Sequence, residues 1–170
     1  MRFAKKSLGQ NFLIDSNIIR KIINLVNIKG KDIVEIGPGR GALTDEILKN
    51  KPRSLSLIEK DFYLAGKLKE KYDKNFVKIY NNDILKFDIE KIINNKNSII
   101  FGNLPYNISS QILVKILKFK KWPPRFSDVI FMFQKELGQK IIAKYSSSSY
   151  GRLAILSNYR LNAFNYFLIS

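Results

Sequence analysis

Residues 103–106, Asn-Leu-Pro-Tyr, carry the groups with the clearest chemical potential in this sequence. The side-chain oxygen of Asn103 and the backbone carbonyl of Leu104 could accept both N–H groups of an exocyclic amine, such as the N6 amine of adenine. Accepting these bonds gathers negative partial charge on the nitrogen and turns its lone pair toward an electrophile. Pro105 would stiffen the turn, and Tyr106 could stack on the base. These residue types indicate alkylation of an amine, with a sulfonium as a fitting methyl donor.

Such a transfer needs no strong general base, because the amine becomes acidic only as it gains the methyl group. The sequence fits this requirement, since it contains no histidine and no cysteine. Their absence excludes Cys/His zinc sites, disulfides, cysteine nucleophiles and histidine bases, and with them most hydrolase mechanisms. No metal site is expected. Residues 103–106 also have the form of the Asn/Asp-Pro-Pro/aromatic signature of enzymes that methylate exocyclic amines.

Three glycines at alternate positions, Gly37, Gly39 and Gly41, interrupt an apolar run and precede a helical pattern. Glycine tolerates positive φ and lets a ligand approach the backbone, which indicates a nucleotide-type ligand over this turn. About 20 residues further on, Glu59 ends a second apolar run and could bind both hydroxyls of a ribose. The G-x-G-x-G spacing after Glu35 favours S-adenosyl-L-methionine, with NAD as the alternative ligand.

Strand-like and helix-like patterns alternate along the chain and predict an α/β fold with a parallel sheet and helices on both faces. Ligands of such sheets bind at the carboxyl ends of the strands, where Gly37, Glu59, Asp83 and Asn103 fall. Residues 152–160 could be helix or strand. Strands are expected at 32–36, 54–59, 76–80, 98–101, 129–133 and 162–169, and helices at 16–28, 41–50, 61–72, 88–93, 107–117 and 134–145.

The charge balance is strongly basic, with 30 Lys and Arg against 14 Asp and Glu and a formal net charge of +16. Nucleic acid is the leading explanation, because basic side chains that neutralise phosphates release counterions. A lysine-rich surface that only maintains solubility is the alternative. We find no signal peptide and no apolar run of spanning length, so a soluble, cytoplasmic protein is expected. The length of 170 residues suits one domain, 1–170, with a basic arm at 1–14.

Five segments stand out as motifs: 7–15 (SLGQNFLID), 35–44 (EIGPGRGALT), 103–110 (NLPYNISS), 134–136 (QKE) and 150–153 (YGRL). Together they resemble the ribosomal RNA adenine dimethyltransferase family, specifically its small-subunit branch, and the match runs nearly end to end. The resemblance implies a doubly wound, Rossmann-like class I methyltransferase sheet. It also implies an enzyme of ribosome biogenesis that uses S-adenosylmethionine to dimethylate the N6 amines of two adjacent adenines near the 3′ end of small-subunit ribosomal RNA.

The resemblance also suggests roles for individual residues. In the cofactor site, Asn11 and Leu13 would close over the ligand, Gly37 would lie under its methionine part, Glu59 would hold the ribose and Asp83 would meet the adenine ring. Asn103 would border the cofactor and present the target amine together with Leu104, Pro105 and Tyr106. The wider cofactor set includes Glu35, Gly39, Gly41, Lys60 and Ile84. It further suggests an aromatic that stacks near the target, for which Phe12 and Tyr106 are the candidates. Independently of the resemblance, the basic excess makes Lys5, Lys6, Arg40 and Arg152 candidates for contacts with RNA phosphates.

The family has a further strand and a C-terminal helical domain that this sequence lacks, so a C-terminally truncated chain is expected. Without the inserting strand, residues 162–170 would be loosely held, fill the open position in the sheet, or pair with another chain. The expected partner is small-subunit ribosomal RNA or the immature small subunit, with no membrane contact and a monomeric state. Three other functions stay open: a large-subunit methyltransferase of the antibiotic-resistance type, a non-catalytic assembly factor of the small subunit, and an NAD oxidoreductase.

Overall fold

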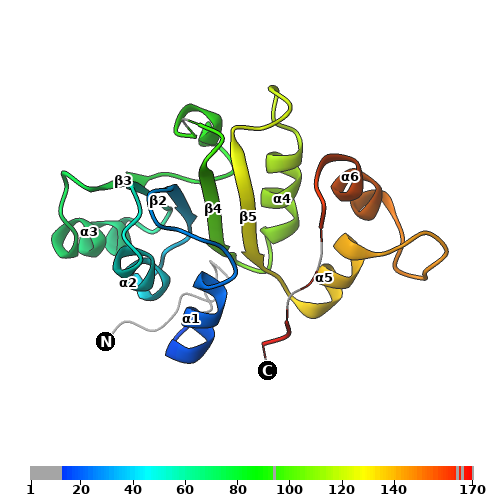
Figure 1. Cartoon of the computed structure of the whole chain (residues 1–170), viewed down its shortest axis with the longest axis horizontal. Coiled ribbons are helices and arrows are strands. Elements are labelled where there is room, and N and C mark those ends of the chain that lie inside the picture. Colours follow the sequence, from blue (N-terminus) through cyan, green and yellow to red (C-terminus); the bar gives the residue numbers. More distant parts are fainter. Residues whose placement is uncertain (1–12, 94, 164, 166, 170) are drawn as a thin grey trace.

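The computed structural model describes residues 13–93, 95–163, 165 and 167–169 of the chain. Its centre is one parallel sheet with the strand order β3-β2-β1-β4-β5 (Figure 1). The order reverses beside β1, so that β2 and β4 flank it on opposite sides. This reversal creates a topological switch point, the usual place for a ligand in such sheets. The strands are β1 (Asp32–Ile36), β2 (Ser54–Glu59), β3 (Val77–Asn81), β4 (Ser98–Asn103) and β5 (Phe126–Met132).

Helices cover both faces of the sheet, as the alternating pattern predicted. On one face, Ile33 of β1 packs with buried residues of α1, α2 and α3, whereas Val34 and Ile36 pack on the other face with residues of α4. Two further helices, α5 and α6, pack against the outer side of α4 through a third cluster. The helices are α1 (Ser16–Ile23), α2 (Ala42–Lys49), α3 (Phe62–Lys71), α4 (Ser109–Leu117), α5 (Lys135–Ile142) and α6 (Arg152–Arg160), with a 3₁₀ turn, η2, at Ile89–Lys91.

Aspartate caps fix the start of two of these helices. The carboxylate of Asp15 accepts the backbone N–H groups of Asn17 and Ile18 at 2.8 and 3.2 Å. Asp61 does the same for Tyr63 and Leu64 at the start of α3. Each cap satisfies amide groups that the first helical turn leaves without a partner.

Several boundaries differ from the sequence prediction. The expected strand at 162–169 is wrong for the described residues, which lie in no strand. Instead, the ring of Phe167 packs beside the core under α1, with the Lys21 ammonium 4.2 Å from the ring centroid. Phe167 therefore packs on the core without belonging to the sheet. Residues 152–160 are a helix, the predicted helix at 88–93 is a single 3₁₀ turn, and α1 ends earlier than predicted.

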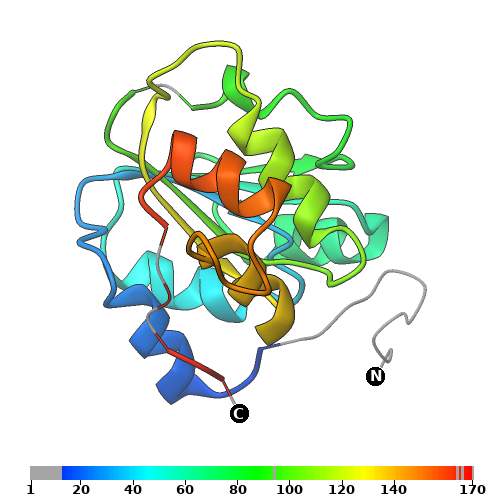
Figure 2. The same ribbon diagram turned by 90° about the vertical axis from the view of Figure 1, so that its right-hand side faces the viewer.

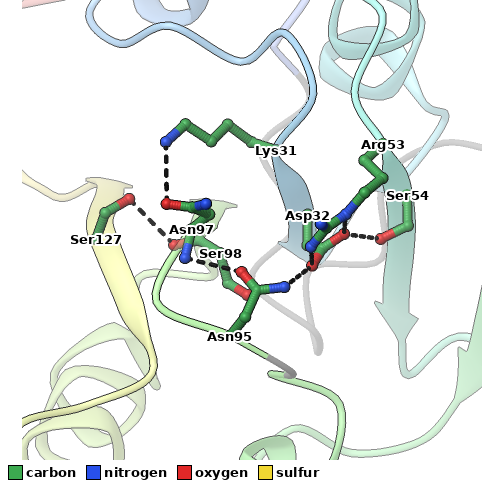
Figure 3. A network of polar contacts seen from close by, with 8 residues as sticks. All are labelled: Lys31, Asp32, Arg53, Ser54, Asn95, Asn97, Ser98 and Ser127. Carbon is green, nitrogen blue, oxygen red and sulfur yellow. Dashed lines mark hydrogen bonds and ion pairs between the residues drawn. The ribbon is translucent and has the colours of Figure 1, made fainter.

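A polar network ties together the amino ends of three strands (Figure 3). The Asp32 carboxylate at the start of β1 accepts Arg53 Nε at 2.8 Å and Ser54 Oγ at 2.7 Å, and it also bonds Arg53 Nη2 and the Asn95 amide. The hydrogen bonds and charge of Arg53 lower the pKa of Asp32 to about 2, against the opposing effect of burial. This network lies at the end of the sheet opposite the ligand-binding edge.

No helix in the described part of the chain is long and apolar enough to cross a membrane.

Candidate active site

A cavity of about 330 Å³ lies at the carboxyl ends of β1, β2 and β4, at the switch point of the sheet. Most of its exposed lining is apolar, from side chains such as Ile36, Ile58 and Ile108, and charged and amide side chains also line it. A mainly apolar cavity with polar groups at fixed positions is typical of sites for small molecules and cofactors. The position and the lining of the cavity therefore indicate a ligand site at the edge of the sheet where the sequence predicted one.

The glycine turn forms one wall of this cavity. Gly37 and Gly39 have φ angles of 68° and 59°, in the left-handed region that disfavours other residues. The Gly37 amide donates to the carbonyl of Ile58 at 2.9 Å, which anchors the turn to β2. A Cβ at Gly37 would make an ordinary contact of 3.7 Å with the Asn103 carbonyl. The positive φ of the turn, rather than a lack of space, therefore explains glycine at this position.

Gly41, the third glycine of the predicted cofactor turn, packs closely against the end of α3. It has a φ of 84° and occupies the position that caps α2, but it does not line the cavity. The Tyr72 hydroxyl donates to the Gly41 carbonyl at 3.1 Å and to Asp45 Oδ1 at 2.7 Å. A Cβ at Gly41 would overlap this hydroxyl. The residue type is explained by the close approach of α3 to the start of α2, on the side of the turn away from the cavity.

Glu59 lies at the end of β2 with only 6% of its surface exposed. Its two oxygens accept the backbone N–H groups of Gly39 at 3.1 Å and Asp61 at 2.8 Å. Burial raises the pKa of Glu59, and these hydrogen bonds oppose the increase. The backbone of Lys60 also bonds this carboxylate. A carboxylate has about four acceptor positions, so it keeps acceptor capacity for a ligand. The bonds to the turn and to α3 fix the carboxylate in an orientation suited to binding a pair of hydroxyls.

Glu35 is the most deeply buried acid of the cavity wall. It is 2% exposed, and its Oε2 accepts the hydroxyl of Thr44 at 2.7 Å. Burial raises its pKa from 4.5 to about 8, with smaller contributions from the charges of Asp45 and Glu59. The side chain is therefore mainly protonated at neutral pH, so that it offers a neutral polar group rather than a second negative charge.

An ion pair closes the side of the cavity formed by β2 and β3. Lys60 Nζ lies 2.9 Å from Asp83 Oδ2, and Asp83 Oδ1 accepts the backbone N–H of Leu85 at 3.0 Å. The hydrogen bond from Lys60 lowers the pKa of Asp83, which keeps the carboxylate ionised at neutral pH. A ligand that hydrogen bonds to Asp83 would meet a fixed acceptor, as expected for the recognition of an adenine amine.

The segment after β4 borders the cavity from the opposite side. Asn103 and Pro105 line it, whereas the side chain of Leu104 is 2% exposed and belongs to the core between the sheet and α4. Only the backbone of Leu104 could therefore serve the predicted role. The side chain of Tyr106 is 44% exposed and does not line the cavity, although it is close in sequence to residues that do. Its exposure suits contact with a large substrate at the mouth.

The structure brings most of the predicted cofactor residues together. Asn11, with Lys5, Lys6 and Phe12 of the predicted RNA set, lies outside the described residues. Arg40, predicted to contact RNA, lies on the cavity wall, whereas Arg152 is exposed on α6. The predicted cofactor residues that line the cavity are Leu13, Glu35, Gly37, Gly39, Glu59, Lys60, Asp83, Ile84 and Asn103.

Sequence reasoning missed part of the lining. Asn82 precedes Asp83, and Asn107, Ile108 and Ile112 follow the Asn-Leu-Pro-Tyr segment into α4. Their proximity to the motifs was the available signal, because residues that follow a strand end lie at the same edge of the sheet. No cluster of acidic residues in the described part of the chain could hold a metal ion.

The chain has the class I methyltransferase fold: a parallel sheet of this order, with a glycine turn after β1, an acid at the end of β2 and Asn-Leu-Pro-Tyr at the end of β4. Residues 1–164 match the ribosomal RNA adenine dimethylase family. The chain belongs to this family, and the predicted fold class is confirmed.

Relatives of known name support the assignment. Over 162 residues the chain is 51% identical to a ribosomal RNA small subunit methyltransferase A of Pelagibacter ubique, covering 94% of the chain and 60% of the relative. The protein of the same name from Francisella tularensis subsp. novicida is 48% identical over 163 residues, covering 94% and 61%. The chain thus spans about 60% of the length of these curated relatives.

Solved structures agree with this assignment. A dimethyladenosine transferase from Plasmodium falciparum superposes with a TM-score of 0.72 at 29% identity, covering 86% of the chain and 51% of that structure. The 23S rRNA methyltransferase ErmE superposes with a TM-score of 0.64 at 26% identity, covering 86% and 55%.

Proposed function

We propose that this chain is the catalytic part of an S-adenosylmethionine-dependent enzyme that dimethylates the N6 amines of two adjacent adenines near the 3′ end of small-subunit ribosomal RNA. One observation carries the proposal: a single cavity joins the glycine turn, the Glu59 carboxylate and Asn103 at the switch point of the sheet. The named relatives support the small subunit as the source of the substrate.

The cavity fits a nucleoside-type cofactor. Glu59 is oriented by Gly39 and Asp61 and keeps acceptor positions for the ribose hydroxyls, while Asp83 can accept from the adenine amine. The amino-acid part would lie against Gly37, which lines the cavity. The cofactor, when bound, supplies an electrophilic methyl group.

In this proposal, the residues of β4 and the following turn prepare the nucleophile. The Asn103 side-chain oxygen and the Leu104 carbonyl accept the two N–H bonds of the adenine amine, which raises electron density on nitrogen and orients its lone pair. Tyr106 stacks on the target base. Unstacking that base from its RNA helix costs a few kcal/mol, which phosphate contacts by the basic surface offset. The proton leaves after methyl transfer, when the amine is acidic, so water suffices as acceptor.

The proposal also covers the setting of the reaction. The whole chain is one methyltransferase domain that acts as a monomer in the cytoplasm, and its substrate is the immature small subunit. These points remain predictions, as do the contacts expected from Asn11, Phe12, Lys5 and Lys6.

The test is transfer of labelled methyl groups to unmethylated small ribosomal particles, followed by digestion to nucleosides. We expect dimethyladenosine from the parent chain, and at least about a hundredfold less from Asn103→Ala, the size of effect seen when a group that stabilises a transition state is removed. Binding of S-adenosylmethionine, measured by calorimetry, should persist in this variant. RNA binding without product from the parent chain would favour an assembly factor, and product only on large-subunit RNA would favour the resistance type.

A further inference from the structure

One exposed face of α6 carries large side chains that the core does not use. Arg152, Ile155 and Tyr159 recur at helical spacing and therefore lie on the same face of the helix. Ile155 is 52% exposed and Tyr159 is 79% exposed. At 1.5 Å per residue, the row extends about 10 Å along the helix. The opposite side of α6 packs on α4 and α5 (Figure 2).

The loop between α5 and α6, which leads into this helix, carries two more exposed aromatic rings. Tyr145 is 83% exposed, and its ring meets that of Tyr150 edge to face, with centroids 5.8 Å apart. The loop is held in a defined shape, because the Tyr150 amide donates to the Ser147 carbonyl at 3.0 Å and the Ser147 hydroxyl to the Lys144 carbonyl at 2.8 Å. These backbone and side-chain bonds fix the conformation of the loop that carries the two exposed rings.

The other end of the row is ordered by cation–π contacts. The Arg160 guanidinium lies 4.6 Å from the Trp122 ring centroid and 5.7 Å from that of Tyr159. Arg160 therefore links Tyr159 to the loop between α4 and β5. A large aromatic side chain held in place at the surface costs little entropy when it binds a partner.

The charge of this region identifies the partner. Residues 135–161 contain five Lys and Arg against one acid, Glu136 in the first turn of α5. Exposed aromatic rings interleaved with basic side chains are the combination that single-stranded nucleic acids require, since bases stack on the rings and phosphates pair with the cations. An apolar protein partner would not need this excess of positive charge.

We propose that the row formed by Tyr145, Tyr150, Arg152, Ile155 and Tyr159, the α6 strip, binds single-stranded RNA. Bases stack on the exposed tyrosines, and Arg152 contacts the phosphates, with Lys140 and Lys144 at the edge of the strip. The proposal rests on the proposed function in one respect: the RNA held here is the single-stranded part of the methylation substrate that flanks the target adenines. The α6 strip would then supply binding energy outside the cavity.

The test measures affinity for a fluorescein-labelled 12-nucleotide oligoadenylate RNA by anisotropy over a range of salt concentrations. Tyr145→Ala and Tyr159→Ala should each weaken binding about fivefold or more, while Tyr145→Phe and Tyr159→Phe keep near-parental affinity because the ring is retained. Arg152→Ala should lower the slope of log affinity against log salt by about 0.7, the value for one phosphate contact on a single strand. The tyrosine variants should leave this slope unchanged.

Matched controls come from α3, which packs on the other face of the sheet. Tyr63→Ala removes a tyrosine that is 47% exposed, and Lys69→Ala removes an exposed cation; both should bind the RNA as the parent does. Alanine variants of the α6 strip that bind within twofold of the parent would overturn the proposal. So would sedimentation showing a dimer that Tyr159→Ala dissociates without a change in RNA affinity, since the strip would then bind a second copy of the chain.

The readout is independent of methyl transfer. Loss of RNA affinity in the tyrosine variants supports the α6 strip even if no dimethyladenosine is formed. If Asn103→Ala loses methyl transfer, the proposed enzyme function is supported. If every variant of the α6 strip then keeps both parental activity and parental RNA affinity, the proposed role of the strip is rejected.

Discussion

The buried carboxyl of Glu35 makes the stability of this protein depend on pH in a calculable way. Its pKa is about 8 in the folded chain, against 4.5 for an ordinary glutamate. Between these values the folded state holds a proton that the unfolded state releases, so the free energy of unfolding falls as the pH rises. At about 1.4 kcal/mol per pH unit, the complete interval lowers stability by about 4 to 5 kcal/mol.

Glu35→Gln isolates this contribution. Glutamine has nearly the same shape, stays neutral at every pH and can still accept the Thr44 hydroxyl, which now donates to Glu35 at 2.7 Å. We expect the free energies of unfolding of parent and variant to differ by less than about 1 kcal/mol at pH 5. At pH 8 the free energy of unfolding should be higher in the variant by about 3 to 4 kcal/mol.

The assay is urea unfolding followed by the fluorescence of Trp122, the one tryptophan of the chain. Glu70→Gln is the matched control, because the Glu70 side chain is 67% exposed and its charge is well solvated. The difference in free energy of unfolding between this variant and the parent should not vary appreciably with pH. If the difference in free energy of unfolding between the parent and Glu35→Gln stays constant from pH 5 to pH 8, the reasoning is refuted. Such a result would mean that Glu35 is already ionised in the folded protein.

Two other predictions concern packing and the polar network. Gly41→Ala should lower the free energy of unfolding by about 1–3 kcal/mol in the same assay, because its Cβ would overlap the Tyr72 hydroxyl and its φ is 84°. Gly66→Ala within α3, where a Cβ meets nothing within 4 Å, should instead be neutral or stabilising by up to about 1 kcal/mol, and equal losses in the two variants would contradict this account. Removing Arg53 by Arg53→Ala should raise the pKa of Asp32 from about 2 toward 3.8 and shift acid unfolding, followed by circular dichroism, to higher pH. A carboxylate with a lowered pKa stabilises the folded state at pH values above its unfolded pKa, and this contribution is lost as the pH falls. An unchanged acid transition would therefore show that Arg53 does not determine the pKa of Asp32.

The sequence was most informative where one residue type is dictated by backbone geometry. Glycines at 37 and 39 and the acid at the next strand end could be read from spacing alone, because the turn requires positive φ and parallel strands end at one edge. At Gly41 the structure adds a constraint that no local pattern reveals: the close approach of Tyr72, 31 residues away, at the end of α3.

Contacts between distant parts of the chain, and the position of a strand in the sheet, could not be predicted from local sequence patterns. The bonds between Asp32 and Asn95 join positions 63 residues apart, and nothing near Asp32 indicates its partner. β5 was expected to be a buried strand from its continuous apolar run, yet Val129 through Met132 are only partly buried, because β5 stands at the edge of the sheet among the described residues. Hydrophobicity identified the strand but not its place in the strand order.

The Asp32 network also has a consequence for cooperativity. Its carboxylate binds Arg53 beside β2, 21 residues away, and Asn95 just before β4, 63 residues away, so the complete set of bonds forms only when β1, β2 and the start of β4 are assembled. Elements linked in this way open together rather than one at a time, and amide exchange at the amino ends of these three strands should require their joint opening. At the carboxyl ends, the loops that line the cavity are joined by bonds of the same kind, from the Gly37 amide to the Ile58 carbonyl and from the Gly39 amide to Glu59. Both ends of the sheet are therefore held by bonds between segments that are distant in the sequence.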